Sequence, residues 1–181
     1  MATSILFSVA PYHIISYGTL LGTTFFHSFV NGIVMFRTLQ RPDFSAVQQK
    51  IFPIYFSAQT FIPLFLALTF PASKLRGIAG GLAGIFHDSN RWTALAPLAA
   101  MLTCGAANLL VMEPLVTQCM ADRWAQEKKD GKRSYDPAPH SAEMSALNKR
   151  FGKLHGISSI FNLGSFVATV AYGFDIARRL Q

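Results

Sequence analysis

The sequence predicts an all-α membrane protein, a bundle of four transmembrane helices, from two observations. Of its 181 residues, 51% are hydrophobic and only 14% are charged, whereas soluble domains carry about 25% charged residues. Charged side chains are also absent from four long runs, 1–36, 51–73, 92–112 and 154–174. A helix needs about 20 apolar residues to cross a hydrocarbon core about 30 Å thick, so each run is long enough to span a membrane.

The borders of these runs set the spans of one transmembrane domain that covers residues 1–181. The predicted spans are about 14–36, 52–70, 92–117 and 154–175. We expect the third helix to continue beyond the membrane through Lys129. The first run lacks the basic start and the cleavage site of a signal peptide, so it is interpreted as a spanning helix.

Amphipathic and glycine-rich segments connect the spans. Apolar side chains recur at helical spacing in 42–52, which predicts a short helix lying in the membrane interface. The proline-containing stretch 131–140 predicts a linker, after which Ser141 caps an amphipathic helix that leads into the fourth span. The glycine-rich stretch 77–86 is too short to cross a bilayer. It is either a loop or a re-entrant segment, and its composition favours the loop.

Lysine and arginine counts set the predicted orientation. The loops 37–51 and 118–153 hold three and eight basic residues, whereas the N-terminus, the 71–91 loop and the C-tail hold none, three and two. The positive-inside rule therefore makes 118–153 a cytoplasmic linker and places both termini on the other side. The net charge of +7 favours anionic lipid headgroups as partners rather than nucleic acid. The endoplasmic reticulum or another endomembrane is the expected location, with a mitochondrial membrane as the alternative.

Polar side chains inside the spans predict a binding site. A polar group in hydrocarbon is unfavourable, so each one needs a function or a partner. At about 1.5 Å per residue, all four spans place such groups in the cytoplasmic half of the bundle, while the outer half is mostly apolar. The sequence thus predicts a polar pocket open to the cytoplasm, or else hydrogen bonds that join the helices. The candidate ligand-binding residues are Asn31, Gln59, Asn108, Glu113, His155, Ser158, Ser159 and Asn162.

Other chemistries have weaker support. We find no hydrolytic triad, no clustered metal carboxylates and no nucleotide-binding glycine motif, so we expect no enzyme activity, metal or cofactor. His27 and His155 lie at different predicted depths, which disfavours a shared haem. Sulfur-containing residues form a stripe on the third helix, which we interpret as core packing rather than a soft-metal site. Its members are Met101, Cys104, Met112 and Cys119, with Asn108 between them.

Gly18 and Gly22 form a small-residue pair on the first helix. Such a spacing permits close helix contact, either within one bundle or between two copies. The pair therefore predicts a homo-oligomer as one of two outcomes.

Three segments together resemble a known family. Residues 49–56 open the second span, Asn108 with Glu113 and Pro114 marks the third, and residues 154–163 open the fourth. This arrangement resembles the transmembrane protein 205-like family of eukaryotic four-helix membrane proteins, over nearly the whole chain. The resemblance implies a four-helix membrane protein whose biochemical activity is poorly defined. A vertebrate member is associated with resistance to platinum drugs, which would suit export of thiophilic compounds. The matching residues are Pro53, Tyr55, Asn108, His155, Ser158, Ser159 and Asn162.

Two functions therefore remain. In the first, the bundle binds or exports a small ligand through its polar pocket. In the second, the protein is a non-catalytic accessory or scaffold, and the same polar residues only pack the helices.

Overall fold

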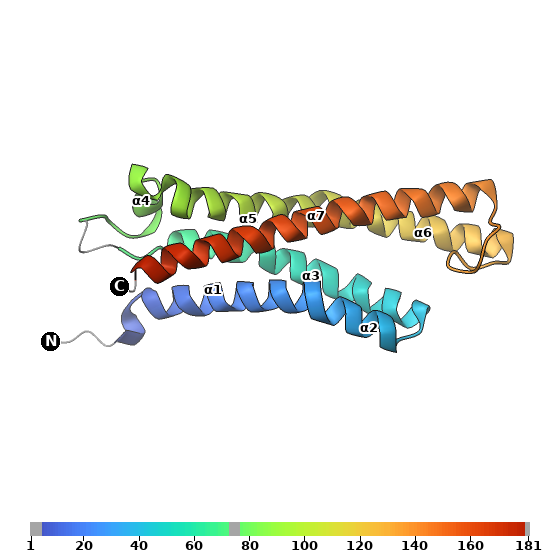
Figure 1. The fold of residues 1–181 in the computed structure, drawn as a ribbon, viewed down its shortest axis with the longest axis horizontal. Helices are drawn as coiled ribbons and strands as arrows, with labels where there is room; N and C mark the ends of the chain where they lie inside the picture. Colours follow the sequence, from blue (N-terminus) through green and yellow to red (C-terminus); the bar gives the residue numbers. More distant parts are fainter. Residues whose placement is uncertain (1–4, 73–76, 180–181) are drawn as a thin grey trace.

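The computed structural model describes residues 5–72 and 77–179, and four long helical rods lie side by side in this part (Figure 1). The rods are Ala10–Thr38, Arg41–Leu68, Asp88–Asp130 and Ala142–Arg179, and each is long and apolar enough to cross a membrane. The first, third and fourth predicted spans lie within one rod each. The second predicted span, 52–70, extends slightly past the end of its rod at Leu68. The all-α membrane bundle is thus confirmed.

The first and third rods are built from more than one helical element. The first contains α1 (Ala10–Phe25), the π-helix η2 (Phe26–Asn31) and α2 (Gly32–Thr38). The second is α3 (Arg41–Leu68), and the fourth is α7 (Ala142–Arg179). The third contains η3 (Asp88–Asn90), η4 (Arg91–Leu95), α5 (Ala96–Ala107), η5 (Asn108–Met112) and α6 (Glu113–Asp130). The short helices η1 (Ile5–Phe7) and α4 (Gly81–Ile85) lie outside the rods.

The two ends of the bundle differ. The N- and C-termini and α4 lie at one end, which we call the termini end (Figure 1). The α2–α3 turn and the connection from α6 to α7 lie at the other, which we call the linker end. The α6–α7 hairpin projects beyond the α2–α3 turn in this view.

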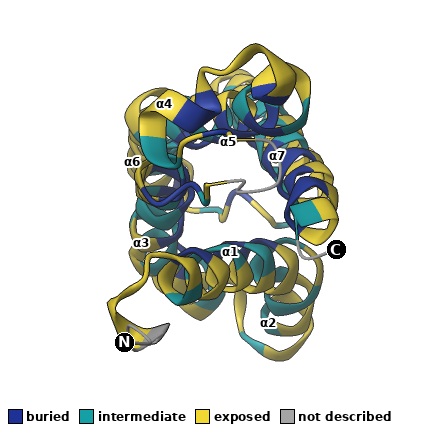
Figure 2. Ribbon diagram, turned by 90° about the vertical axis from the view of Figure 1, so that its left-hand side faces the viewer, coloured by how far each residue is buried: buried dark blue, intermediate teal, exposed yellow. Residues whose placement is uncertain are grey.

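The outer surface of the rods is apolar. Buried residues face the neighbouring helices, and exposed residues cover the outside (Figure 2). Large hydrophobic side chains are among the most exposed, including Ile54 at 72%, Leu110 at 69% and Ile160 at 69%. Soluble monomers rarely expose large contiguous apolar patches. A belt of this kind is the surface that lipid covers, so burial pattern and helix length agree.

One glycine sets the closest approach between two rods. A Cβ atom added at Gly105 of α5 would lie 2.7 Å from the backbone oxygen of Gln59 in α3. Only a residue without a side chain lets the two backbones come this near, as small residues do between membrane helices.

The linker end confirms two predicted signals. Gly131 ends α6 in the left-handed conformation, with φ of 63°, the conformation that commonly terminates helices. The Ser141 hydroxyl oxygen accepts a hydrogen bond from the Met144 amide at 3.1 Å, which satisfies one free amide of the first turn of α7. Residues 131–140 are therefore the linker, and α7 continues without a break into the fourth span.

The segment 42–52 differs from the prediction of a separate interfacial helix. It forms the first turns of α3, and the helix continues through Pro53. The segment packs against α2, where the Phe44 and Phe36 ring centroids lie 5.5 Å apart. Gln48 in the same segment is buried. Protein contacts therefore cover Gln48 and part of Phe44, whereas Val47 of the same segment is 37% exposed.

The glycine-rich stretch 77–86 includes the single short helix α4, which packs on the end of α3. The Gly81 amide donates to the Phe70 carbonyl at 2.7 Å. Lys74 and Arg76, which contributed to the predicted orientation, lie outside the described residues.

Candidate functional site

Polar side chains of α3 and the first rod meet in the middle of the bundle. The Tyr55 hydroxyl accepts a hydrogen bond from Gln59 Nε2 at 2.8 Å and lies 3.1 Å from Ser28 Oγ. The His27 ring packs against Tyr55, with centroids 4.3 Å apart. Asn31 Nδ2 donates to His27 Nδ1 at 3.2 Å, so the proton of a neutral His27 ring resides on Nε2.

A second polar group lies between the third rod and α7. Asn108 Nδ2 donates to Asn162 Oδ1 at 3.2 Å and to the Ser158 carbonyl at 3.3 Å. Asn108 follows Gly105 by one helical turn, and Gly105 packs on Gln59. The two groups therefore lie at the same level. We call this set the central polar layer: His27, Ser28, Asn31, Tyr55, Gln59, Asn108, Ser158 and Asn162.

Several buried atoms in and beside this layer have no hydrogen-bond partner among the described residues. They are Thr24 Oγ1, His27 Nε2, Gln59 Oε1, Asn108 Oδ1 and Ser165 Oγ. Buried polar atoms are normally paired with protein or ordered water, and this set offers donors as well as acceptors. The π-helices η2 and η5 lie at the same level, and such turns are frequent at functional sites. The layer can therefore bind water or another small polar molecule.

Three of the predicted site residues lie away from the layer. Glu113 is half-buried and accepts a hydrogen bond from Thr117 Oγ1 at 3.0 Å. His155 and Ser159 are exposed, and the Ser159 hydroxyl donates to the His155 carbonyl of its own helix.

The exposure of His155 and Ser159 follows from the direction of the inward face of α7. Buried or half-buried residues recur along this face every seven positions, at Met144, Phe151, Ser158, Ser165 and Tyr172. At about 100° per residue, His155 lies roughly 60° and Ser159 roughly 100° away from Ser158 around the helix. The sequence argument centred the inner face on the line through His155 and Ser159, so the predicted face was displaced toward the exposed side of α7.

A groove opens at the linker end, near the predicted membrane border. Its volume is about 300 Å³, and it lies between the α2–α3 turn, α6 and the first half of α7. Most of its wall is aromatic or apolar. We call it the linker-end groove, and it is lined by Phe36, Arg41, Pro42, Phe44, Ser45, Gln48, Gln49, Phe52, Val116, Met120, Arg123, Trp124, Glu127, Arg133, Tyr135, Phe151 and His155. Of the predicted site residues, His155 lines it.

Two of the three groove arginines have polar partners within the protein. Arg123 Nε donates to Asn148 Oδ1 at 3.0 Å, and its guanidinium lies 4.4 Å from the Phe151 ring. Arg133 Nη1 donates to Glu127 Oε2 at 3.2 Å. The Arg41 guanidinium lies over the Phe36 ring at 3.6 Å. No ion pair with a carboxylate forms at Arg41 within the described ranges.

Glu127 lies outside the membrane, because the third rod is 43 residues long. A helix of that length measures about 65 Å, roughly twice the hydrocarbon thickness. Burial by itself raises the pKa of Glu127. Hydrogen bonds from the Ser134 amide and from Arg133 outweigh burial, and they lower the pKa below its usual value.

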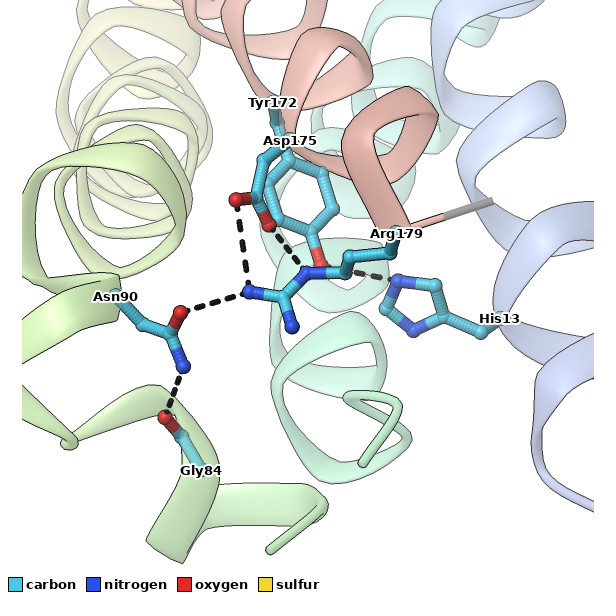
Figure 3. A network of polar contacts seen from close by, with 6 residues as sticks. All are labelled: His13, Gly84, Asn90, Tyr172, Asp175 and Arg179. Atoms are coloured by element: carbon cyan, nitrogen blue, oxygen red, sulfur yellow. Dashed lines mark hydrogen bonds and ion pairs between the residues drawn. The ribbon is translucent and has the colours of Figure 1, made fainter. Parts of the chain in front are cut away.

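The termini end contains a buried chain of hydrogen bonds that the sequence did not predict (Figure 3). His13 Nδ1 lies 3.0 Å from Thr69 Oγ1, and His13 Nε2 lies 2.9 Å from the Tyr172 hydroxyl. The Thr69 hydroxyl donates its only proton to the Phe65 carbonyl. His13 therefore donates through Nδ1 and accepts from Tyr172 through Nε2. The chain joins α7 to α1 and α1 to α3.

A buried ion pair adjoins that chain (Figure 3). Arg179 Nε lies 2.7 Å from Asp175 Oδ2, and their side chains are 15% and 7% exposed. Arg179 Nη2 also donates to Asn90 Oδ1 at 2.8 Å, and Asn90 Nδ2 donates to the Gly84 carbonyl at 2.7 Å. The guanidinium lies 4.3 Å from the Phe70 ring. The ends of α7, α3 and the third rod are thereby tied together.

Sequence reasoning missed this termini-end network because its members lie at the borders of charge-free runs. Asp175 comes directly after the fourth run, and His13 was placed before the first span. The spacing of Asp175 and Arg179 by four residues was the available signal, since such pairs share one helix face.

Metal-binding geometry is absent from the described part of the chain, where no three His, Cys, Asp or Glu residues cluster as a metal site. In the sulfur stripe, Met101, Met112 and Cys119 are buried and Cys104 is half-buried. These positions agree with the core-packing interpretation.

The comparisons with known proteins place the chain in a family. The profile of the family described as a domain of unknown function, DUF4149, matches residues 15–125. The protein named "Xanthocillin biosynthesis cluster protein D" of Aspergillus fumigatus is 31% identical over 173 residues, which cover 96% of this chain and 92% of that protein. No solved structure matches. Since the profile covers more than half of the chain and the relative nearly all of it, the chain belongs to the DUF4149 family.

Proposed function

We propose that this multi-pass membrane protein binds a small amphipathic molecule in the linker-end groove. One observation carries the proposal, namely a groove of about 300 Å³ lined by aromatic side chains, which lies near the predicted membrane border. Small-molecule sites have volumes of about 300–1,000 Å³, apolar walls and a few polar groups. Molecules with an apolar body and a polar end concentrate at the border between the hydrocarbon and the headgroups of a bilayer. They can therefore reach a groove at this depth.

The proposal also draws on the name of one relative, the Aspergillus fumigatus protein, which refers to a xanthocillin biosynthesis cluster. Export of thiophilic compounds, which would suit the resemblance to the transmembrane protein 205-like family, is part of the same proposal. In the predicted orientation of the protein, the linker-end groove faces the cytoplasm. We propose an endomembrane as the location, with anionic lipid headgroups next to the basic side of the protein.

Transport requires more than this bundle, because carriers usually move repeated units against each other. A homo-oligomer supplies such units. Gly18 and Gly22 leave one face of α1 open, since a Cβ atom added at either position would meet nothing within 4 Å. We propose this face as the contact between copies.

A non-catalytic scaffold function is the second candidate, and the central polar layer favours it. Its hydrogen bonds join helices in pairs, through Tyr55 with Ser28 and through Asn108 with Asn162. Such bonds contribute about 0.6 kcal/mol each in membrane bundles. In this function the polar residues only hold the helices together.

Filling the groove tests the binding function. Val116→Phe places a ring in the groove, whereas Ala100→Phe places the same ring on an exposed face of α5. The wild type and both variants are purified in mild detergent, and the small molecules released by denaturation are quantified by mass spectrometry. We expect a molecule that accompanies the wild type and Ala100→Phe in fixed ratio and is lost from Val116→Phe. Equal amounts in all three, including none, would contradict the proposal.

A further inference from the structure

We propose that the linker-end groove selects a single-chain amphiphile with an anionic group at one end and a hydrogen-bond donor about 10 Å away. Arg41 binds the anion and Gln48 accepts the hydrogen bond. This inference rests on the proposed function, because it names the ligand class of the same groove.

The charge of the groove favours an anion. Its lining contains Arg41, Arg123, Arg133 and one acidic residue, Glu127. Arg123 and Arg133 are held by protein groups, whereas Arg41 stacks on Phe36 without a carboxylate partner among the described residues. The guanidinium therefore retains its donors, which pair well with a carboxylate.

The position of Arg41 strengthens that preference. It is the first residue of α3, where the free backbone amides of a helix favour negative charge. Asp43 in the same turn is exposed and is not part of the groove lining. The side chain of Asp43 is therefore not placed to occupy the anion position.

The second polar contact comes from Gln48. This residue lines the groove, its exposed fraction is only 8%, and its Oε1 atom has no hydrogen-bond partner in the described part of the chain. A buried acceptor without a partner is unfavourable by about 1–3 kcal/mol. A ligand hydroxyl or amine would supply the missing donor.

The distance between the two contacts limits the ligand. Arg41 and Gln48 lie seven residues apart on one helix, which corresponds to two turns and about 10 Å. Phe44 lies between them in the sequence, and Phe52 and Phe151 add to the same wall. We take this backbone spacing as the length of the ligand, which corresponds to an apolar chain of about eight carbons.

Trp124 provides a reporter for binding, because it lines the groove. The protein has two tryptophans, and Trp92 belongs to η4 at the termini end. In a Trp92→Phe background, all indole fluorescence comes from Trp124. The protein is reconstituted in phosphatidylcholine nanodiscs and titrated with octanoate, ω-hydroxyoctanoate and octanediol.

We expect ω-hydroxyoctanoate to change Trp124 fluorescence with the highest affinity, about tenfold above octanediol, because an ion pair of this kind contributes roughly one decade. Arg41→Gln should remove that tenfold preference. Arg37→Gln, a matched charge removal on exposed α2 outside the groove, should leave it. Gln48→Leu should weaken ω-hydroxyoctanoate several-fold and spare octanoate, which has no donor at that end.

Several outcomes would overturn the inference. If octanediol binds as tightly as the acid, or if Arg37→Gln acts like Arg41→Gln, the groove does not select an anion. If nanodiscs with phosphatidylglycerol abolish probe binding, a bilayer lipid occupies the groove instead. Absence of binding by all three probes also overturns the ligand class. The proposed function still stands in that case if Val116→Phe loses a molecule that the wild type retains.

Discussion

The Asp175–Arg179 pair gives the sharpest prediction about stability. Arg179→Met leaves the Asp175 carboxylate, 7% exposed, without its cation. Removing one partner of a buried pair costs about 3–5 kcal/mol, and we expect about 4 kcal/mol here. The same change also removes the bond to Asn90 and the contact with the Phe70 ring. The lost free energy therefore belongs to the whole termini-end network.

Asp175→Asn is expected to lower the free energy of unfolding by a smaller amount. Arg179 then keeps Asn90 and Phe70, and it is 15% exposed. The loss is a charged hydrogen bond, about 2 kcal/mol. The double variant, Asp175→Asn with Arg179→Met, contains neither charge. We therefore expect its free energy of unfolding to fall by about 3 kcal/mol, well below the sum of the two single changes.

The measurement is reversible unfolding in mixed micelles by added dodecyl sulfate, followed by far-ultraviolet circular dichroism. Arg178→Met is the matched control, because Arg178 is exposed and such surface changes alter stability by less than about 0.5 kcal/mol. A double variant that loses the full sum of about 6 kcal/mol would refute the coupling between the two side chains.

Three further predictions follow from other parts of the bundle. Gly105→Ala should destabilise the protein by about 1–3 kcal/mol in the same assay, because its Cβ would meet the α3 backbone; Gly156→Ala, which meets nothing within 4 Å, should not. The lowered pKa of Glu127 gives stability that is complete above the usual pKa of a glutamate and is lost as the pH falls through the lowered value. Unfolding free energies from pH 6 to pH 2 should therefore decline more steeply for wild type than for Glu127→Gln, and parallel curves would contradict the ion pair. In a chain without its native cysteines, His155→Cys should react with an impermeant maleimide added on the linker side, whereas Asn108→Cys, fully buried, should be protected; equal labelling would mean that water reaches the central polar layer from that side.

The sequence predicted the fold well because lipid imposes a strong constraint on composition. Four charge-free runs correspond to four rods, and Ser141 and Gly131 marked the ends of the linker through local backbone chemistry. The continuity of 42–52 with α3 was not visible, because Pro53 is usually a helix breaker. In the structure the helix continues through Pro53.

The sites were only partly predictable. Asn108 and Asn162, which the depth argument placed near the same level, share a hydrogen bond. The groove depends on how the α6–α7 hairpin lies against the start of α3, and no pattern along one helix reports that arrangement. The termini-end network depends on pairs such as His13 and Tyr172, which are 159 residues apart.

That separation has a consequence for biosynthesis. His13 leaves the ribosome before Tyr172, which follows 159 residues later. Pairing of the first helix with α3 through Thr69 can form early, but the Tyr172 hydroxyl is the last partner to arrive. Until α7 inserts, His13 Nε2 therefore lacks the hydroxyl partner that it has in the finished bundle, and contacts of such long range form slowly.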